Sequence, residues 1–121
     1  MVSGFKKTEK NNYGKIIFSG KNNPVEIIEQ KDAELKNIHS QFCNGGIMAI
    51  HSSVINDLDK IEKNTITNEY YLTELVKILS LQNKEIVFVE INENLVSGDP
   101  LDFTDTKKYT TRFDGYILLN T

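Results

Sequence analysis

The stretch NTITNEYYLTELVKILS, residues 64–80, decides the fold that this sequence predicts. We read it as a loop that enters an amphipathic helix, because Thr67 or Asn68 can accept hydrogen bonds from the free amides of a first helical turn. Tyr70 precedes a second tyrosine, and adjacent residues cannot share a helix face, so Tyr70 is expected to point toward a cleft or a neighbouring element. The residues expected on the buried face, at helical spacing, are Tyr71, Leu75, Ile78 and Leu79.

Runs of β-favouring residues on both sides of this helix predict a sheet. Residues 85–91, EIVFVEI, have the near-continuous apolar character of a strand covered on both faces. Residues 15–18 and 25–29 predict a hairpin with a long polar tip and with Pro24 at a strand edge. Residues 42–50, FCNGGIMAI, predict a buried strand whose central Asn-Gly-Gly tolerates something lying against its backbone. Together with the helix, these strands indicate the α/β class.

Shorter elements complete the predicted domain. A short strand opens the chain, and a polar loop follows it. Asp32 is expected to cap a two-turn helix that ends near Ile38. Residues 99–121 show no consistent period, so we expect a loosely held tail there. Ser52 or Ser53 is expected to cap a further helix, one side of which carries Val54, Ile55, Leu58 and Ile61.

The composition argues against several classes of function. The chain has 121 residues, 26% of them charged, and a formal net charge of -3, so no basic face indicates nucleic-acid binding. The longest apolar run, residues 86–89, is far too short to span a bilayer, so we expect a soluble protein without a membrane partner. A single cysteine cannot form an internal disulfide, which fits a reducing cytoplasm.

Few side chains of this sequence indicate chemistry by themselves. His39 and His51 have no second ligand at metal-binding spacing, so neither predicts a metal site. Cys43 lies inside an apolar run, where a small core residue is favoured over a nucleophile. Residues 44–46, Asn-Gly-Gly, lack the lysine and the hydroxyl residue that follow the glycines of a phosphate-binding loop. We therefore assign no catalytic residue and no metal ligand.

Four motifs in one order are more specific. They are YGKI at 13–16, IEQKDA at 28–33, FCNGGIMA at 42–49 and NEYYLTE at 68–74. This order resembles that of bacterial N-acetylglucosamine-1-phosphate uridylyltransferases, and the resemblance covers residues 2–98. It implies that residues 1–98 are the C-terminal half of a nucleotidyltransferase domain, with a three-layer α/β/α, Rossmann-like architecture and a mixed sheet. In that family a sugar 1-phosphate attacks UTP and expels pyrophosphate with the assistance of magnesium, which yields UDP-N-acetylglucosamine for cell wall biogenesis.

The resemblance also implies a set of sugar-binding residues. Gly14 would offer its backbone amide to the sugar, because it has no side chain to block close approach. Glu29 would accept hydrogen bonds from sugar hydroxyls, and Asn44 would both donate and accept. Tyr71 and Thr73 would line the same pocket from the helix. From the residues alone, a hairpin glycine, a solvated carboxylate and a turn-forming asparagine remain alternatives for the first three.

The departures from the family concern the nucleotide and the metal. The Gly-rich loop, the lysine that handles the nucleotide and one magnesium-binding aspartate belong to the first half of the family domain, which these motifs do not include. The turn that supplies a second metal ligand in the family reads Gly98-Asp99-Pro100 here, with proline in place of asparagine. Proline has no side-chain donor for a metal. The chain is therefore not expected to catalyse nucleotidyl transfer alone, and no cofactor is assigned to it.

Two functions follow from this comparison. The first is a truncated UDP-N-acetylglucosamine pyrophosphorylase-like domain that retains a site for UDP-N-acetylglucosamine or a sugar phosphate. The second is a binding module that docks with a separately encoded nucleotide-binding half. A half-domain would expose strand edges at 42–50 and 86–91, so self-association is expected where no partner covers them. An unrelated small α/β domain would require the four motifs to be a coincidence.

Overall fold

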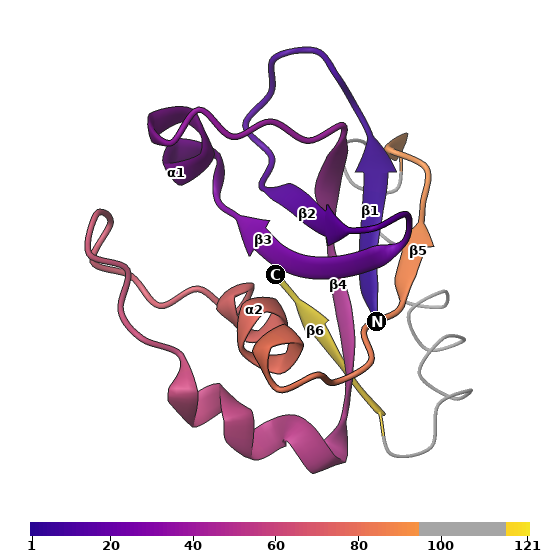
Figure 1. The fold of residues 1–121 in the computed structure, drawn as a ribbon, viewed down its shortest axis with the longest axis vertical. Coiled ribbons are helices and arrows are strands. Elements are labelled where there is room, and N and C mark those ends of the chain that lie inside the picture. Colours follow the sequence, from indigo (N-terminus) through magenta and orange to yellow (C-terminus); the bar gives the residue numbers. More distant parts are fainter. Residues whose placement is uncertain (95–115) are drawn as a thin grey trace.

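The computed structural model describes residues 1–94 and 116–121, and it confirms the α/β class with a mixed sheet (Figure 1). The elements in chain order are β1 (Val2–Lys6), β2 (Lys15–Ser19), β3 (Asn23–Ile28), α1 (Gln30–Leu35), β4 (Phe42–His51), the 3-10 helix η1 (Ser52–Lys60), α2 (Glu74–Leu81), β5 (Phe88–Glu90) and β6 (Tyr116–Asn120). Among these residues no helix combines the length and the apolar character that crossing a membrane requires.

The sheet is built around β4. Its path is β3-β2-β4-β1-β5, with β6 also paired to β4. Strands β1 and β5 are parallel, whereas the other pairs are antiparallel. Cys43 pairs with both β1 and β2, and Met48 pairs with both β1 and β6, so β1 follows one edge of β4 while β2 and β6 share the other.

The core lies between one face of the sheet and α2. Leu75 in α2 is fully buried, and the sheet residue Ile16 is equally inaccessible. Burial of such side chains stabilises the fold by roughly 1.5–3 kcal/mol each. In Figure 1, α2 lies in front of the sheet near β4 and β6, and η1 runs below it, past the end of β4. The buried members of the cluster are Val2, Ile16, Ile27, Met48, Ile50, Leu75, Val76, Leu79 and Ile86.

The hairpin of β2 and β3 was predicted correctly, but its tip is short. Ser19 pairs with Asn23, so three residues connect the strands, and Gly20 among them has a φ of 73°. Glycine adopts this left-handed conformation without steric cost. Pro24 lies in β3, which is the edge strand beside β2, as predicted. A proline is tolerated in an edge strand because one side of the strand has no neighbouring strand to accept an amide hydrogen.

The main helix begins later than predicted. α2 starts at Glu74, so the two tyrosines belong to the preceding loop. Asn68 has a φ of 62°, and the Asn64 side chain accepts hydrogen bonds from the amides of residues 66 and 67. These local bonds hold a turn where a first helical turn was expected. Tyr70 is 68% exposed and pairs with Lys63 in an isolated bridge, so of the two expected surroundings, a cleft or a neighbouring element, it has the second.

The two shorter helices also differ from the prediction at their starts. Asp32 lies inside the first turn of α1 rather than at its cap, which is Glu29. The segment after β4 is a 3-10 helix, and His51 rather than a serine caps it by accepting a hydrogen bond from the Ser53 amide. Of its four expected core residues, Ile55 points outward and is 43% exposed.

The two last strands depart most from expectation. β5 is three residues long, and Val89 within it is 42% exposed, so this strand is not covered on both faces. Residues 116–120, expected in a loosely held tail, form β6 and pair with residues 47–51. The edge of β4 that was expected to be bare is therefore paired. The other residues of the expected tail, 99–115, lie outside the described part of the chain.

Candidate functional site

Four of the five sugar-site candidates lie in two contacting pairs, and the first pair is Gly14 with Asn44. The backbone N–H of Asn44 donates to the Gly14 carbonyl at 2.8 Å. Gly14 directly precedes β2, so it is not a hairpin-turn glycine. A Cβ at Gly14 would lie 3.3 Å from the Ile28 carbonyl oxygen, which is tighter than an ordinary contact. The absence of a side chain therefore lets this segment approach the end of β3.

The second pair joins Glu29 and Thr73. The Thr73 hydroxyl donates to Glu29 Oε1 at 2.9 Å, and Thr73 is only 4% exposed. Thr73 is the N-cap of α2 but its side chain makes no capping bond, so the hydroxyl is committed to the glutamate. Glu29 is half-buried and follows Ile28, which Gly14 approaches. The two pairs are thus adjacent at the end of β3.

The Asn44 side chain is already engaged. Its Nδ2 donates to Thr121 Oγ1 at 3.1 Å, and its Oδ1 accepts a hydrogen bond from the Gly46 amide at 3.1 Å. The second contact spans two residues, and it is the local bond of a turn-forming asparagine. A ligand that uses both atoms of this amide would have to replace these partners.

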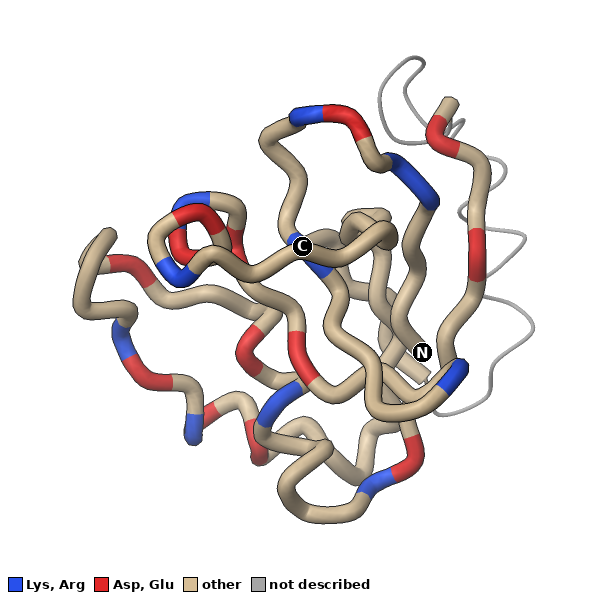
Figure 2. The backbone as a smooth tube through the Cα atoms, turned by 45° about the horizontal axis from the view of Figure 1, so that its top comes forward, with Lys and Arg blue, Asp and Glu red and all other residues tan. Residues whose placement is uncertain are grey.

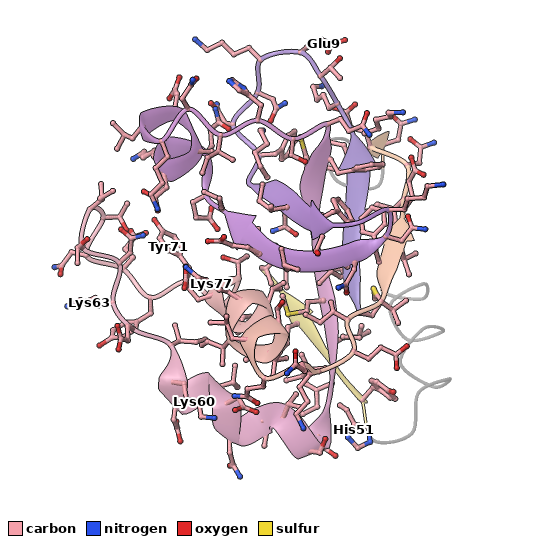
Figure 3. All side chains as sticks on the ribbon, in the orientation of Figure 1. Glu9, His51, Lys60, Lys63, Tyr71 and Lys77 are labelled. Atoms are coloured by element: carbon pink, nitrogen blue, oxygen red, sulfur yellow. The ribbon has the colours of Figure 1, made fainter. Side chains whose placement is uncertain are left out.

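Tyr71 is oriented differently from the other four candidates. Its hydroxyl donates to Thr67 Oγ1 at 2.8 Å, within the loop that precedes α2. Figure 3 labels Tyr71 at the approach to this helix, on the same side of the molecule as Lys77. The hydrogen bond fixes the ring in the loop, two residues before Thr73.

The glycines of β4 are explained by the chain itself. A Cβ at Gly45 would lie 2.6 Å from Ser3 Oγ and 2.8 Å from Ile91 Cδ1. Something does lie against this backbone, as predicted, but it is protein rather than a ligand. Gly46 has a φ of 81°, a conformation that favours glycine. At Gly45, the space that a side chain would need is therefore taken by Ser3 and Ile91.

Two cavities flank the sheet, and neither is lined by the five candidates. One, of about 460 Å³, is mainly apolar and lies where Val76 of α2 approaches β4 and β5. The other, of about 590 Å³, lies between the β1–β2 loop and α1. Residues 1–94 and 116–121 contain no group of three or more His, Cys, Asp or Glu side chains that could hold a metal ion. We therefore derive no step through magnesium.

Charged side chains form pairs outside this cluster. The carboxylate of Asp57 in η1 accepts hydrogen bonds from Lys60 at 2.7 Å and from Gln82 at 3.0 Å. These bonds, the one from Lys60 above all, lower the pKa of Asp57. The Lys7 ammonium donates to Glu93, and this bond raises the pKa of Lys7. The Gln82 bond ties η1 to the end of α2, and the Lys7–Glu93 pair ties the segment after β1 to the segment after β5.

Lys15, to which the sequence assigned no role of its own, is buried at the start of β2. It is only 9% exposed, although lysines are seldom buried without a charged partner. One signal was available: this lysine directly precedes the apolar residues Ile16 and Ile17 of a predicted strand.

Comparison with known proteins shows which proteins this chain resembles. No protein-family model matches the chain. It is 40% identical over 100 residues to the bifunctional protein GlmU of Bartonella bacilliformis. The aligned region covers 81% of this chain and 22% of that protein. The GlmU of Bradyrhizobium diazoefficiens is 38% identical over 96 residues, which make up 78% of this chain and 21% of that protein. The GlmU of Alcanivorax borkumensis is 35% identical over 86 residues, which make up 70% of this chain and 19% of that protein.

The fold is that of an α/β domain with a mixed sheet, consistent with part of a nucleotidyltransferase-like domain. Over about four fifths of its length the chain is homologous to one segment of the bifunctional protein GlmU. It spans about a fifth of the length of these relatives.

Proposed function

We propose that this domain binds the sugar portion of UDP-N-acetylglucosamine or of the corresponding sugar phosphate. The observation that carries the proposal is the convergence of Gly14, Glu29, Asn44 and Thr73 at the end of β3, by way of two hydrogen-bonded pairs. These residues come from four segments that are distant in sequence. Their convergence supports the resemblance to sugar nucleotidyltransferases, because a binding site needs its groups on one surface.

The chemistry of the four groups suits a sugar. The Glu29 carboxylate is an acceptor only, so it can hold ligand hydroxyls beside the Thr73 hydroxyl that it already accepts. The Asn44 side chain has both a donor and an acceptor, and one of its partners, Thr121, is exposed. Exchange of that bond for one to a sugar would cost little, because the released hydroxyl can turn to water. Tyr71 belongs to the proposed set through the family resemblance, and its hydroxyl donates to Thr67 in the loop before α2.

Binding of UDP-N-acetylglucosamine, followed by ligand-observed NMR, tests the proposal. We expect millimolar affinity, equivalent to about 4 kcal/mol, because a site of this extent buries little of the ligand. Glu29→Ala and Asn44→Ala should each weaken the signal. The matched controls are Glu34→Ala on α1 and Asn22→Ala in the β2–β3 turn, which remove the same chemical groups from exposed positions. Equal signals from all five proteins would show that the site is not real.

We further propose that the residues of this chain do not carry out nucleotidyl transfer by themselves. The motifs that match the family concern the sugar, whereas its nucleotide loop, lysine and metal ligands are not among them. Nucleotidyl transfer depends on positioning and on cationic stabilisation of charge, which these groups supply. The purified chain with magnesium, UTP and N-acetylglucosamine 1-phosphate should release no pyrophosphate above background. Robust release that depends on the protein would disprove this part.

A second candidate function is that of a module that docks with a separately encoded nucleotide-binding half, in the cytoplasm. A specific observation favours it: Val87, Val89 and Tyr116 are 51%, 42% and 47% exposed, and all three line the apolar cavity of about 460 Å³. Exposed apolar residues around a hollow are typical of an interaction surface. Relatives in which the matched segment makes up about a fifth of the chain make such a half the fitting occupant.

Sedimentation velocity separates the possible occupants of this surface. With a co-expressed nucleotide-binding half, the two chains should sediment as one species, and Val89→Lys should separate them. Lys6→Met offers a control at an exposed position of the neighbouring strand β1. Self-association of the chain alone, abolished by the same Val89 substitution, would point to a second copy. If the chain sediments as a compact monomer in the presence of the nucleotide-binding half, docking would be contradicted.

A further inference from the structure

The buried Lys15 ammonium makes only neutral contacts. Its Nζ donates to Asn11 Oδ1 at 2.7 Å, to the Tyr13 carbonyl at 2.7 Å and to Cys43 Sγ at 3.6 Å. The third acceptor is a sulfur atom, which binds hydrogen weakly. Two good acceptors and one poor one therefore hold a full positive charge below the surface.

No carboxylate among residues 1–94 and 116–121 lies within ion-pair distance of Lys15. Burial of an ammonium is costly unless a counter-charge and hydrogen bonds compensate for it. The hydrogen bonds are present here, but a negative charge from the described protein is not. This imbalance distinguishes Lys15 from Lys7, Lys60 and Lys77, each of which has a carboxylate partner.

Lys15 also lines the cavity of about 590 Å³ between the β1–β2 loop and α1. In Figure 2 the charged residues of this loop lie on the same side of the molecule as those of α1. The charged residues of the cavity wall are Lys7, Lys10, Lys15, Glu9 and Glu34, and among these lysines Lys7 is paired with Glu93 and Glu9. Two donors of the wall already have protein partners: Asn11 Nδ2 donates to the Glu9 carbonyl, and the Ser40 hydroxyl donates to the Ile16 carbonyl. The uncharged polar residues of the wall are Thr8, Asn11, Gln30, Asn37, Ser40 and Gln41.

We propose that this cavity binds a small tetrahedral oxyanion, namely inorganic phosphate or the phosphate group of a monoester, with Lys15 as its buried counter-charge. A tetrahedral dianion presents several acceptor oxygens in different directions, which suits donors on a loop, a helix and a strand. A carboxylate offers two coplanar oxygens and suits such a wall less well. The ligand would supply the negative charge that the described protein does not provide.

This site is separate from the proposed sugar site. Neighbouring residues of a strand point to opposite faces of the sheet. Cys43 and Asn44 are neighbours in β4: Cys43 contacts Lys15, whereas Asn44 contacts Thr121. Phosphate binding here therefore stands or falls independently of the proposed sugar binding.

Titration of the ¹⁵N-labelled chain with sodium phosphate tests the proposal by two-dimensional NMR, with sodium chloride at matched ionic strength as the reference. We expect saturable shifts of amide signals confined to the cavity wall, such as those of Asn11, Lys15 and Ser40. Lys15→Met should weaken phosphate binding at least about tenfold. Lys21→Met removes the same charge from the exposed β2–β3 turn and should leave binding unchanged.

Several results would overturn the proposal. They are shifts that chloride reproduces, shifts that Lys15→Met retains, or binding of acetate as tight as that of phosphate. If Lys15→Met does not fold, Lys15→Gln keeps a donor that can still bond to Asn11 and removes only the charge. The titration of the unaltered chain against chloride decides in any case whether phosphate binds in this cavity.

Discussion

Replacement of Thr73 by valine tests the contact that joins α2 to the end of β3. Valine keeps the shape of threonine but leaves Glu29 Oε1 without the hydroxyl that now lies 2.9 Å away. A hydrogen bond to a charged group contributes about 1.5–3 kcal/mol to stability. Because Thr73 is buried, water has little access to this bond on the threonine side. Because the Thr73 side chain makes no capping bond, loss of a helix cap does not add to the effect.

Urea unfolding measures the loss. With a slope of about 1–3 kcal/mol per molar urea, Thr73→Val should lower the unfolding midpoint by about 1 M. Thr73→Ser is the matched control, because it keeps the hydroxyl and loses one methyl group, at a cost of about 0.8 kcal/mol. In combination with Glu29→Ala, the valine should cost little more, since the bond is already gone. A valine variant as stable as the serine variant would refute the reasoning.

Three further substitutions probe the packing and the charges. Gly45→Ala should destabilise the fold by about 1–3 kcal/mol in thermal melts, because its Cβ would meet backbone and side chain of Ser3, and an unchanged midpoint would contradict that crowding. Leu75→Ala should cost about 2–5 kcal/mol, whereas Leu81→Ala at the exposed end of the same helix should cost little; equal losses would argue against the position of α2. The pKa of Asp57 is lowered in the fold, so its contribution is present above its ordinary pKa of 3.8 and is lost as pH falls through the folded value. Asp57→Asn should therefore lose less stability than the unaltered protein as pH falls below 3.8. Urea midpoints that fall equally in the variant and the unaltered protein over this range would contradict the prediction.

Local periodicity predicted the buried face of α2 but not its start. Leu75 and Leu79 recur at helical spacing, and both are buried. The start depends on Asn64, whose side chain bonds to the amides of a turn, and on Asn68, whose backbone is left-handed. Such competition between a side chain and a helix is decided by a few local bonds, which a hydrophobic pattern does not record.

The strands show the same division between local and distant information. β2 and β3 are neighbours in sequence, so alternation and a turn glycine were enough to predict their pairing. β6 was missed because five residues without a clear period do not reveal a partner strand that lies far away in the sequence. The ordered motifs indicated which residues converge at the end of β3. They did not reveal that Ser3 and Ile91 occupy the space against Gly45, because that space is defined only by the assembled sheet.

The pairing of β6 with β4 has a consequence for how the protein reaches its fold. The paired residues are between 65 and 73 positions apart, from His51 with Tyr116 to Ile47 with Asn120. Closure of so long a loop is a slow, entropically costly step. During synthesis, half of β4 therefore emerges well before its partner and presents unpaired backbone groups beside Ile47 and Ala49. Edge-to-edge association at this part of β4 is therefore a risk during synthesis, until β6 has paired with it.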